Sequence, residues 1–199
     1  MTDEKRGQFK EVTGLIVSAV AAVGTVWGIS GSVLSEIVPP VVDAVSLARM
    51  VTFCAVGILM VLCVFIRPDI QKRLQYAWAL LTAVLVAIAL VAFLHYRSQI
   101  REYVYIDPPS AEPSQQHRYI RGDYHEKGQK IAQGLSTEDA VKQAGGREAV
   151  ERNNELWNNE SKNKVTAYLE CYYVFLTTLL TIAIFIGALT LWRAAVLRT

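Results

Sequence analysis

The chain has 199 residues, of which 52% are hydrophobic and 19% are charged, and its formal net charge is +2. So large an apolar share with so few charges favours an integral membrane protein over a soluble one. The small net charge lacks the basic excess typical of nucleic-acid-binding proteins, so no direct binding to nucleic acid is predicted.

Four long apolar stretches, separated by charged residues, dominate the sequence. None of them contains Asp, Glu, Lys or Arg, and they run over Val12–Val33, Met50–Ile66, Leu74–Leu94 and Cys171–Trp192. A bilayer core about 30 Å thick needs about 20 apolar residues in a helix, and a helix satisfies its own backbone hydrogen bonds in lipid. The predicted fold class is therefore an all-α integral membrane protein with four transmembrane helices.

Three regions follow from this layout. Residues 1–95 hold the N-terminal tail and the first three transmembrane helices, 96–165 form a polar extramembrane insert, and 166–199 hold the fourth helix and the C-terminal tail.

Small residues line one face of the first stretch. Gly24, Gly28 and Ser32 recur every four residues. Small residues at this spacing let two membrane helices approach closely. Two partners stay open for this face: a second copy of the chain, which would make the protein a homo-oligomer, or the other helices of the same chain.

Basic residues predict the orientation, because short cytoplasmic segments of membrane proteins are enriched in Lys and Arg. The N-terminal tail, the Arg67–Arg73 connection and the C-terminal tail carry such residues, whereas the loop Ile37–Leu47 has none. We therefore expect both ends in the cytoplasm and the 96–165 insert outside it. Four basic residues beside the insert oppose this prediction: Arg97, Arg101, Lys162 and Lys164.

The insert is predicted to be small and mostly helical, with an irregular first half. Arg97–Ile106 fits either a short strand or a helix extension, and the prolines of Asp107–Pro113 favour an extended linker. Residues 114–126 look polar and irregular, with Tyr119, Ile120 and Tyr124 as candidate anchors.

Helical signals fill the second half of the insert. A short helix is predicted over Lys127–Gln133. A second is predicted to begin at Ser136, whose spacing to Asp139 resembles a capping box, and to stop at Gly145, where a left-handed cap is expected. A third is predicted over Arg147–Trp157.

Charged residues occur at the ends of the stretches and not in their middles. Glu36, Arg49 and Glu170 fall at the predicted outer ends, where ordinary interfacial solvation explains them, with an interfacial polar cluster as the alternative. The lack of charges at mid-membrane depth argues against a secondary transporter.

No pattern for catalysis, a cofactor or a metal is found. Gly-x-Ser-x-Gly, His-Glu-x-x-His and the phosphate-binding loop are all missing from the sequence. The paired acids Glu138 and Asp139 are explained by the dipole of the helix they begin. His117 and His125 supply too few ligands for a metal site. We therefore predict neither an enzyme nor a cofactor.

Two functions are consistent with this layout. The first is an oligomeric membrane sensor or scaffold that contacts membrane lipid and signals to a soluble cytoplasmic protein partner. The second is a pore-forming effector that permeabilises the membrane, for which Thr177, Thr178 and Thr181 would supply hydroxyl groups.

In its length and in the layout of the four stretches named above, the chain resembles the membrane subunit of the Kiwa anti-phage defence system. The resemblance covers the whole chain at the level of layout and transfers no individual functional residue. It implies a multi-pass, homo-oligomeric sensor of the bacterial inner membrane that acts in antiviral defence with a soluble DNA-binding partner.

Overall fold

The computed structural model describes residues 3–30, 38–41, 44–65, 72–106, 118–146 and 156–196, and it divides into two compact units. The first unit, called the bundle below, comprises Met1–Val38, Asp43–His95 and Tyr172–Thr199. The second, called the insert unit, comprises Pro39–Val42 and Tyr96–Cys171.

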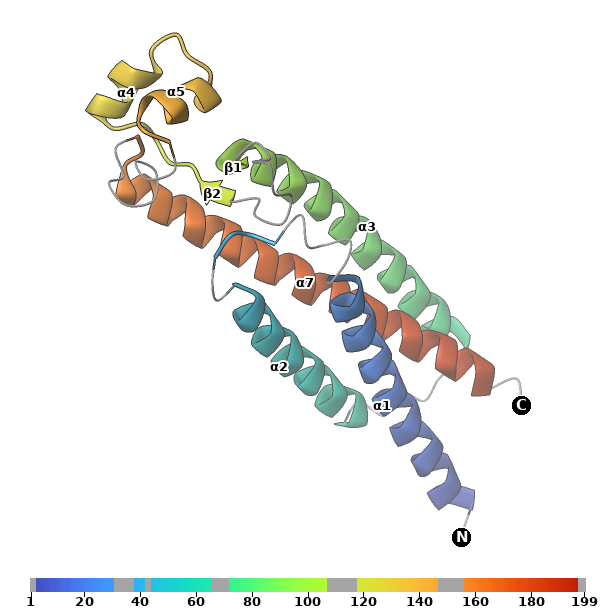
Figure 1. Cartoon of the computed structure of the whole chain (residues 1–199). Helices are drawn as coiled ribbons and strands as arrows, with labels where there is room; N and C mark the ends of the chain where they lie inside the picture. The colour runs from blue at the N-terminus through green and yellow to red at the C-terminus, as the bar shows by residue number, and fades with distance from the viewer. Residues whose placement is uncertain are drawn as a thin grey trace. The chain divides into compact units, whose positions relative to one another are not determined.

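Four long helices contain the apolar stretches. They are α1 (Asp3–Ser30), α2 (Ala44–Phe65), α3 (Lys72–Tyr103) and α7 (Asn159–Val196), as Figure 1 shows. Three of them hold segments long and apolar enough to cross a membrane, namely Ala44–Cys63, Tyr76–Tyr103 and Asn159–Ala195. The prediction of a helical membrane protein is confirmed at this level.

The first helix differs from the other three. Its apolar segment, Val12–Gly28, falls below the length of a complete span. At 1.5 Å per residue this segment covers about 25 Å, somewhat less than a bilayer core of about 30 Å. Residues 31–33 of the predicted first span lie outside the described residues. Four complete spans are therefore not confirmed, and the crossing by α1 stays a prediction.

The fourth apolar helix starts much earlier than its apolar stretch. The side-chain oxygen of Asn158 accepts a hydrogen bond from the Glu160 amide at 2.9 Å, as an N-cap does. An ion pair one turn apart, Lys164 Nζ to Glu160 Oε1 at 2.7 Å, supports the first turns. Local polar contacts thus extend α7 towards its N-terminus beyond the apolar residues.

All four long helices contribute to the core of the bundle. Its buried members are Leu15, Ala19, Ala22, Val56, Phe185, Ile186 and Leu189, and Trp78 and Leu85 of α3 pack against them. Leu15 of α1 and Leu189 of α7 belong to the same cluster, and Figure 1 shows the two helices running in opposite directions. Two glycines permit close approach, because a Cβ at Gly14 would overlap the Trp192 indole and one at Gly187 would lie 3.1 Å from Thr82 Cγ2.

The outward faces of these helices are apolar as well. Val20, Met50, Val91 and Leu191 are between 60% and 73% exposed. Large aliphatic side chains in such numbers would be unfavourable in water and are ordinary in contact with acyl chains.

The insert unit contains a small sheet as well as helices. Strands β1 (Val104–Ile106) and β2 (Arg118–Ile120) pair antiparallel, with Tyr105 opposite Tyr119. Residues 118–120 were predicted to be irregular, and that prediction is wrong, because their aromatic and β-branched side chains match those of Val104–Ile106 across the ladder. Arg97–Ile106 was predicted to be either a helix extension or a short strand, and it contains both. Helix α3 continues to Tyr103, and β1 follows over Val104–Ile106.

Two short helices, α4 (Glu126–Ala132) and α5 (Thr137–Gln143), complete the described part of this unit. The Ser136 hydroxyl accepts from the Asp139 amide at 3.2 Å and donates to the Asp139 carboxylate at 2.6 Å, so the predicted cap is confirmed. Gly145 has φ +107°, as the predicted left-handed stop requires.

The core of the insert unit is formed by Tyr105, Ala140, Val141, Leu156 and Trp157. Trp157 forms an isolated antiparallel bridge with Tyr124, so the end of the helix predicted over Arg147–Trp157 is wrong. Residues 147–155 of that helix lie outside the described residues. Tyr119 and Tyr124 pack against this core, which confirms their predicted anchoring role.

Candidate functional site

The small-residue face predicted on α1 is open within the described residues. Gly24 and Gly28 are exposed, and a Cβ added to either would meet nothing within 4 Å. Ser32 lies outside the described residues. A neighbouring face of α1 also carries small residues every four positions, namely Gly14, Ser18 and Ala22. This second face is covered, because Ser18 and Ala22 are 2% and 0% exposed inside the bundle. One small face of α1 is thus occupied by the chain's own helices, and the other is not.

Arg49 of α2 lies against the ring of Trp27 on α1. Its guanidinium carbon is 5.2 Å from the ring centroid, within the range of a cation–π contact. Glu36, its first predicted partner, lies outside the described residues, and Glu170 belongs to α7 in the insert unit. The polar cluster of Glu36, Arg49 and Glu170 therefore stays a prediction, whereas the aromatic partner of Arg49 is an addition that sequence spacing did not indicate.

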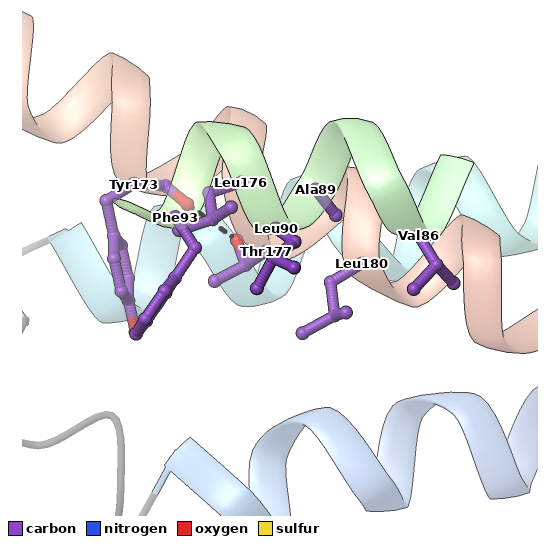
Figure 2. Close-up of a pocket in the computed structure, with 8 residues that line it drawn as sticks. All are labelled: Val86, Ala89, Leu90, Phe93, Tyr173, Leu176, Thr177 and Leu180. Atoms are coloured by element: carbon purple, nitrogen blue, oxygen red, sulfur yellow. Dashed lines mark hydrogen bonds between the residues drawn. The ribbon is translucent and has the colours of Figure 1, made fainter. Parts of the chain in front are cut away.

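An apolar groove lies between α3 and α7 in the bundle. Its volume is about 230 Å³, and it is lined by Val86, Ala89, Leu90, Phe93, Tyr173, Leu176, Thr177 and Leu180. Figure 2 shows these side chains, with the rings of Phe93 and Tyr173 together at one end and Val86 towards the other. The groove thus follows the two helices along their length.

Two of the three threonine hydroxyl groups predicted for a pore are bonded to their own helix, whereas the Thr178 hydroxyl is buried without a hydrogen-bond partner among the described residues. Thr177 Oγ1 donates to the Tyr173 carbonyl at 2.9 Å, and Thr181 Oγ1 donates to the Thr177 carbonyl at 2.8 Å. Both threonines are at most 2% exposed. Threonine hydroxyls that bond the preceding turn offer little to a passing ion. These two residues therefore do not form a polar path through the bundle.

The polar residues of the insert that drew attention in the sequence stabilise helix ends. His125 Nδ1 accepts from the amides of Lys127 and Gly128 at 3.0 and 3.2 Å, so this histidine is the N-cap of α4. Glu138 pairs with Lys142 at 2.7 Å and thereby raises the pKa of that lysine. His117 lies outside the described residues. These contacts give His125, Glu138 and Asp139 structural roles in α4 and α5.

Sequence patterns missed the groove and the close packing of Gly128. A Cβ at Gly128 would overlap the Leu156 carbonyl, a contact between residues far apart in the chain. No local signal reports either feature, because both depend on which helix faces are brought together. The one hint was the small residue Ala89 between bulky neighbours of α3.

Comparison with known proteins gives no relative. No protein-family model matches the chain, and no similar curated protein or solved structure was found.

Proposed function

We propose that this protein is an oligomeric membrane sensor or scaffold that assembles through the Gly24–Gly28 face of α1 and signals to a soluble partner. The observation that carries this proposal is the open space over both glycines. Small residues spaced by four promote helix association in lipid, because they let two helices pack closely. Burying large apolar side chains between helices gives no hydrophobic free energy there, since the acyl chains around them are equally apolar. A face of this kind that none of the described helices of the same chain covers suits a second copy.

The insert unit supports the signalling half of the proposal. It has its own buried core of Tyr105, Ala140, Val141, Leu156 and Trp157, and the described polar residues serve its helix caps and ion pairs. A unit that folds around its own core can present a stable surface to a partner. The resemblance to the Kiwa membrane subunit agrees with this reading and suggests a role in anti-phage defence in the bacterial inner membrane.

A pore is the weaker alternative. It would need a polar path, and Thr177 and Thr181 are buried and bonded to backbone carbonyls of their own helix. No observation in the described part of the chain favours conduction over assembly.

The test replaces each glycine by leucine and measures assembly by native mass spectrometry in lipid nanodiscs. Gly24→Leu and Gly28→Leu should leave the folded protomer intact, because nothing lies within 4 Å of the new side chain, and should shift the protein from oligomer to monomer. Gly57→Leu on α2 is the matched control, since Gly57 is equally exposed and open and should leave assembly unchanged. An unchanged oligomer in both α1 variants, or a monomeric wild type, would reject the proposal.

A further inference from the structure

Helix α3 carries two arginines close to its C-terminal end. Arg97 and Arg101 are four residues apart, so they lie on the same face of the helix, and both are exposed. They belong to the insert unit, away from the Gly24–Gly28 face of α1, so a role for them does not depend on the proposed assembly.

No acidic side chain balances these two charges within the described residues. Like charges four residues apart slightly destabilise a helix. The acid that α3 contains, Glu102, is one residue from Arg101 and five from Arg97, so it occupies none of the helix positions that face either arginine. No ion pair joins either arginine to an acid in the described part of the chain. This face therefore presents two positive charges that need an anion from outside it.

The apolar length of α3 places the two arginines among lipid headgroups. The stretch Leu74–Leu94 contains no charged residue, and at 1.5 Å per residue it is about 31 Å long, which matches a bilayer core of about 30 Å. The headgroup layer on each side of the core is about 5–7 Å thick. Arg97 follows Leu94 by about 4.5 Å along the helix axis, inside this layer, and Arg101 follows it by about 10 Å.

The direction of the side chains brings Arg101 back towards the same layer. In an α-helix the Cα–Cβ bonds tilt towards the N-terminus. Because α3 ends in the insert unit, its arginines lean towards the membrane, and long basic side chains place their charge among headgroups in this way. Helix α7 begins in the insert unit, so the same tilt directs Lys164 away from the membrane, and Lys164 is already paired with Glu160.

Phosphate is the anion that suits this face. The planar guanidinium group matches the oxygens of a phosphate, and phosphates lie in the headgroup layer where Arg97 is placed. In phosphatidylethanolamine an ammonium group of the same headgroup competes for the phosphate, whereas phosphatidylglycerol carries no cation. An acidic protein would have to displace lipid from this layer to reach both arginines, so an anionic phospholipid is the favoured ligand.

We infer that Arg97 and Arg101 of α3 form a binding site for the phosphate of an anionic phospholipid. The two Cα atoms are about 6 Å apart along the helix axis, so both guanidinium groups can reach one headgroup. This role does not depend on which side of the membrane the insert unit faces, because both leaflets contain phospholipid phosphate.

The test measures the lipid that the full-length protein retains from vesicles of equal phosphatidylglycerol and phosphatidylethanolamine, by native mass spectrometry. The wild type should retain more phosphatidylglycerol. Arg97→Gln and Arg101→Gln should each lower the ratio of phosphatidylglycerol to phosphatidylethanolamine about fivefold, equivalent to about 1 kcal/mol for one basic residue at an anionic surface, and the double variant about 25-fold. A wild type without this preference, or a double variant that keeps it, would overturn the inference.

Lys164→Gln is the matched control, since it removes the same charge from the start of α7. It should leave the lipid ratio unchanged, and a loss equal to that of the arginine variants would overturn the inference, because general surface charge would then select the lipid. Hydrogen exchange of the buried Ala140 and Val141 amides should stay as slow as in the wild type, since both arginines are exposed.

Photo-labelling of the wild-type protein tests the same site without a substitution. Phosphatidylglycerol with a diazirine on its glycerol headgroup should label residues 97–101 of α3 more strongly than residues 159–164 of α7. Label on 97–101 that is equal to or weaker than label on 159–164 would overturn the inference.

Discussion

The free-energy cost of removing a buried leucine should differ between the two units, and two leucines with similar burial allow the comparison. Leu156 in the insert unit is 1% exposed and Leu189 in the bundle is 4% exposed, and each belongs to the core of its unit. The same substitution, Leu to Ala, removes the same atoms from both. Any difference between the two losses in unfolding free energy therefore reflects the medium that the leucine meets on unfolding, which is water for the insert unit and lipid for the bundle.

The expected costs follow from two contributions. Leu→Ala removes the equivalent of three methylene groups, so the lost transfer free energy in water is about 2.4 kcal/mol at about 0.8 kcal/mol each. Measured totals for buried leucines are about 2.7–5 kcal/mol, which leaves up to about 2.6 kcal/mol for the cavity. In a bilayer the separated helix still contacts hydrocarbon, so the transfer contribution vanishes and the cavity contribution remains. We expect Leu156→Ala to cost about 3–4 kcal/mol and Leu189→Ala about 1–2 kcal/mol.

The assay differs between the units. For the insert unit, hydrogen exchange of the buried Ala140 and Val141 amides gives the free energy of opening in the full-length protein. For the bundle, reversible unfolding in mixed lipid and SDS micelles gives the free energy of unfolding. If Leu189→Ala proves as costly as Leu156→Ala, the bundle does not exchange contacts with lipid, and the reasoning is refuted.

Three further substitutions test single contacts. Gly128→Ala should destabilise the insert unit by about 1–3 kcal/mol, because its Cβ overlaps the Leu156 carbonyl, and hydrogen exchange as slow as in the wild type would contradict this packing. Ser136→Ala should cost about 1 kcal/mol and speed exchange at the start of α5, and unchanged exchange there would show that the cap is dispensable. Gly14→Leu should lower the SDS resistance of the bundle through its clash with Trp192, and full resistance would place α1 away from α7.

Local signals in the sequence predicted local structure well. The cap at Ser136 and the left-handed stop at Gly145 depend on a few neighbouring residues, and both were predictable. The long apolar stretches likewise indicated helices, because their length and composition act within one segment. The exact ends were less predictable, since α7 begins at Asn159 through a cap and an ion pair outside the apolar stretch.

Features that join distant segments were not predictable in the same way. The pairing of Val104–Ile106 with Arg118–Ile120 depends on a connection that brings two short segments together. The groove arises only when the Ala89 face of α3 meets the Leu176 face of α7. Of the candidate site, Gly24 and Gly28 could be named from their spacing, but only the structure shows that the described residues of their own chain leave them open.

The most direct test of a four-helix membrane protein is a count of its crossings. Single cysteines placed by Thr2→Cys, Ser110→Cys and Thr199→Cys, in a chain whose own cysteines are replaced, can be labelled in intact cells with an impermeant maleimide. Four crossings with both ends in the cytoplasm predict label on the cysteine at position 110 and protection of those at positions 2 and 199 until the cells are lysed. If position 2 is labelled together with position 110, α1 does not cross the membrane, and the account is contradicted.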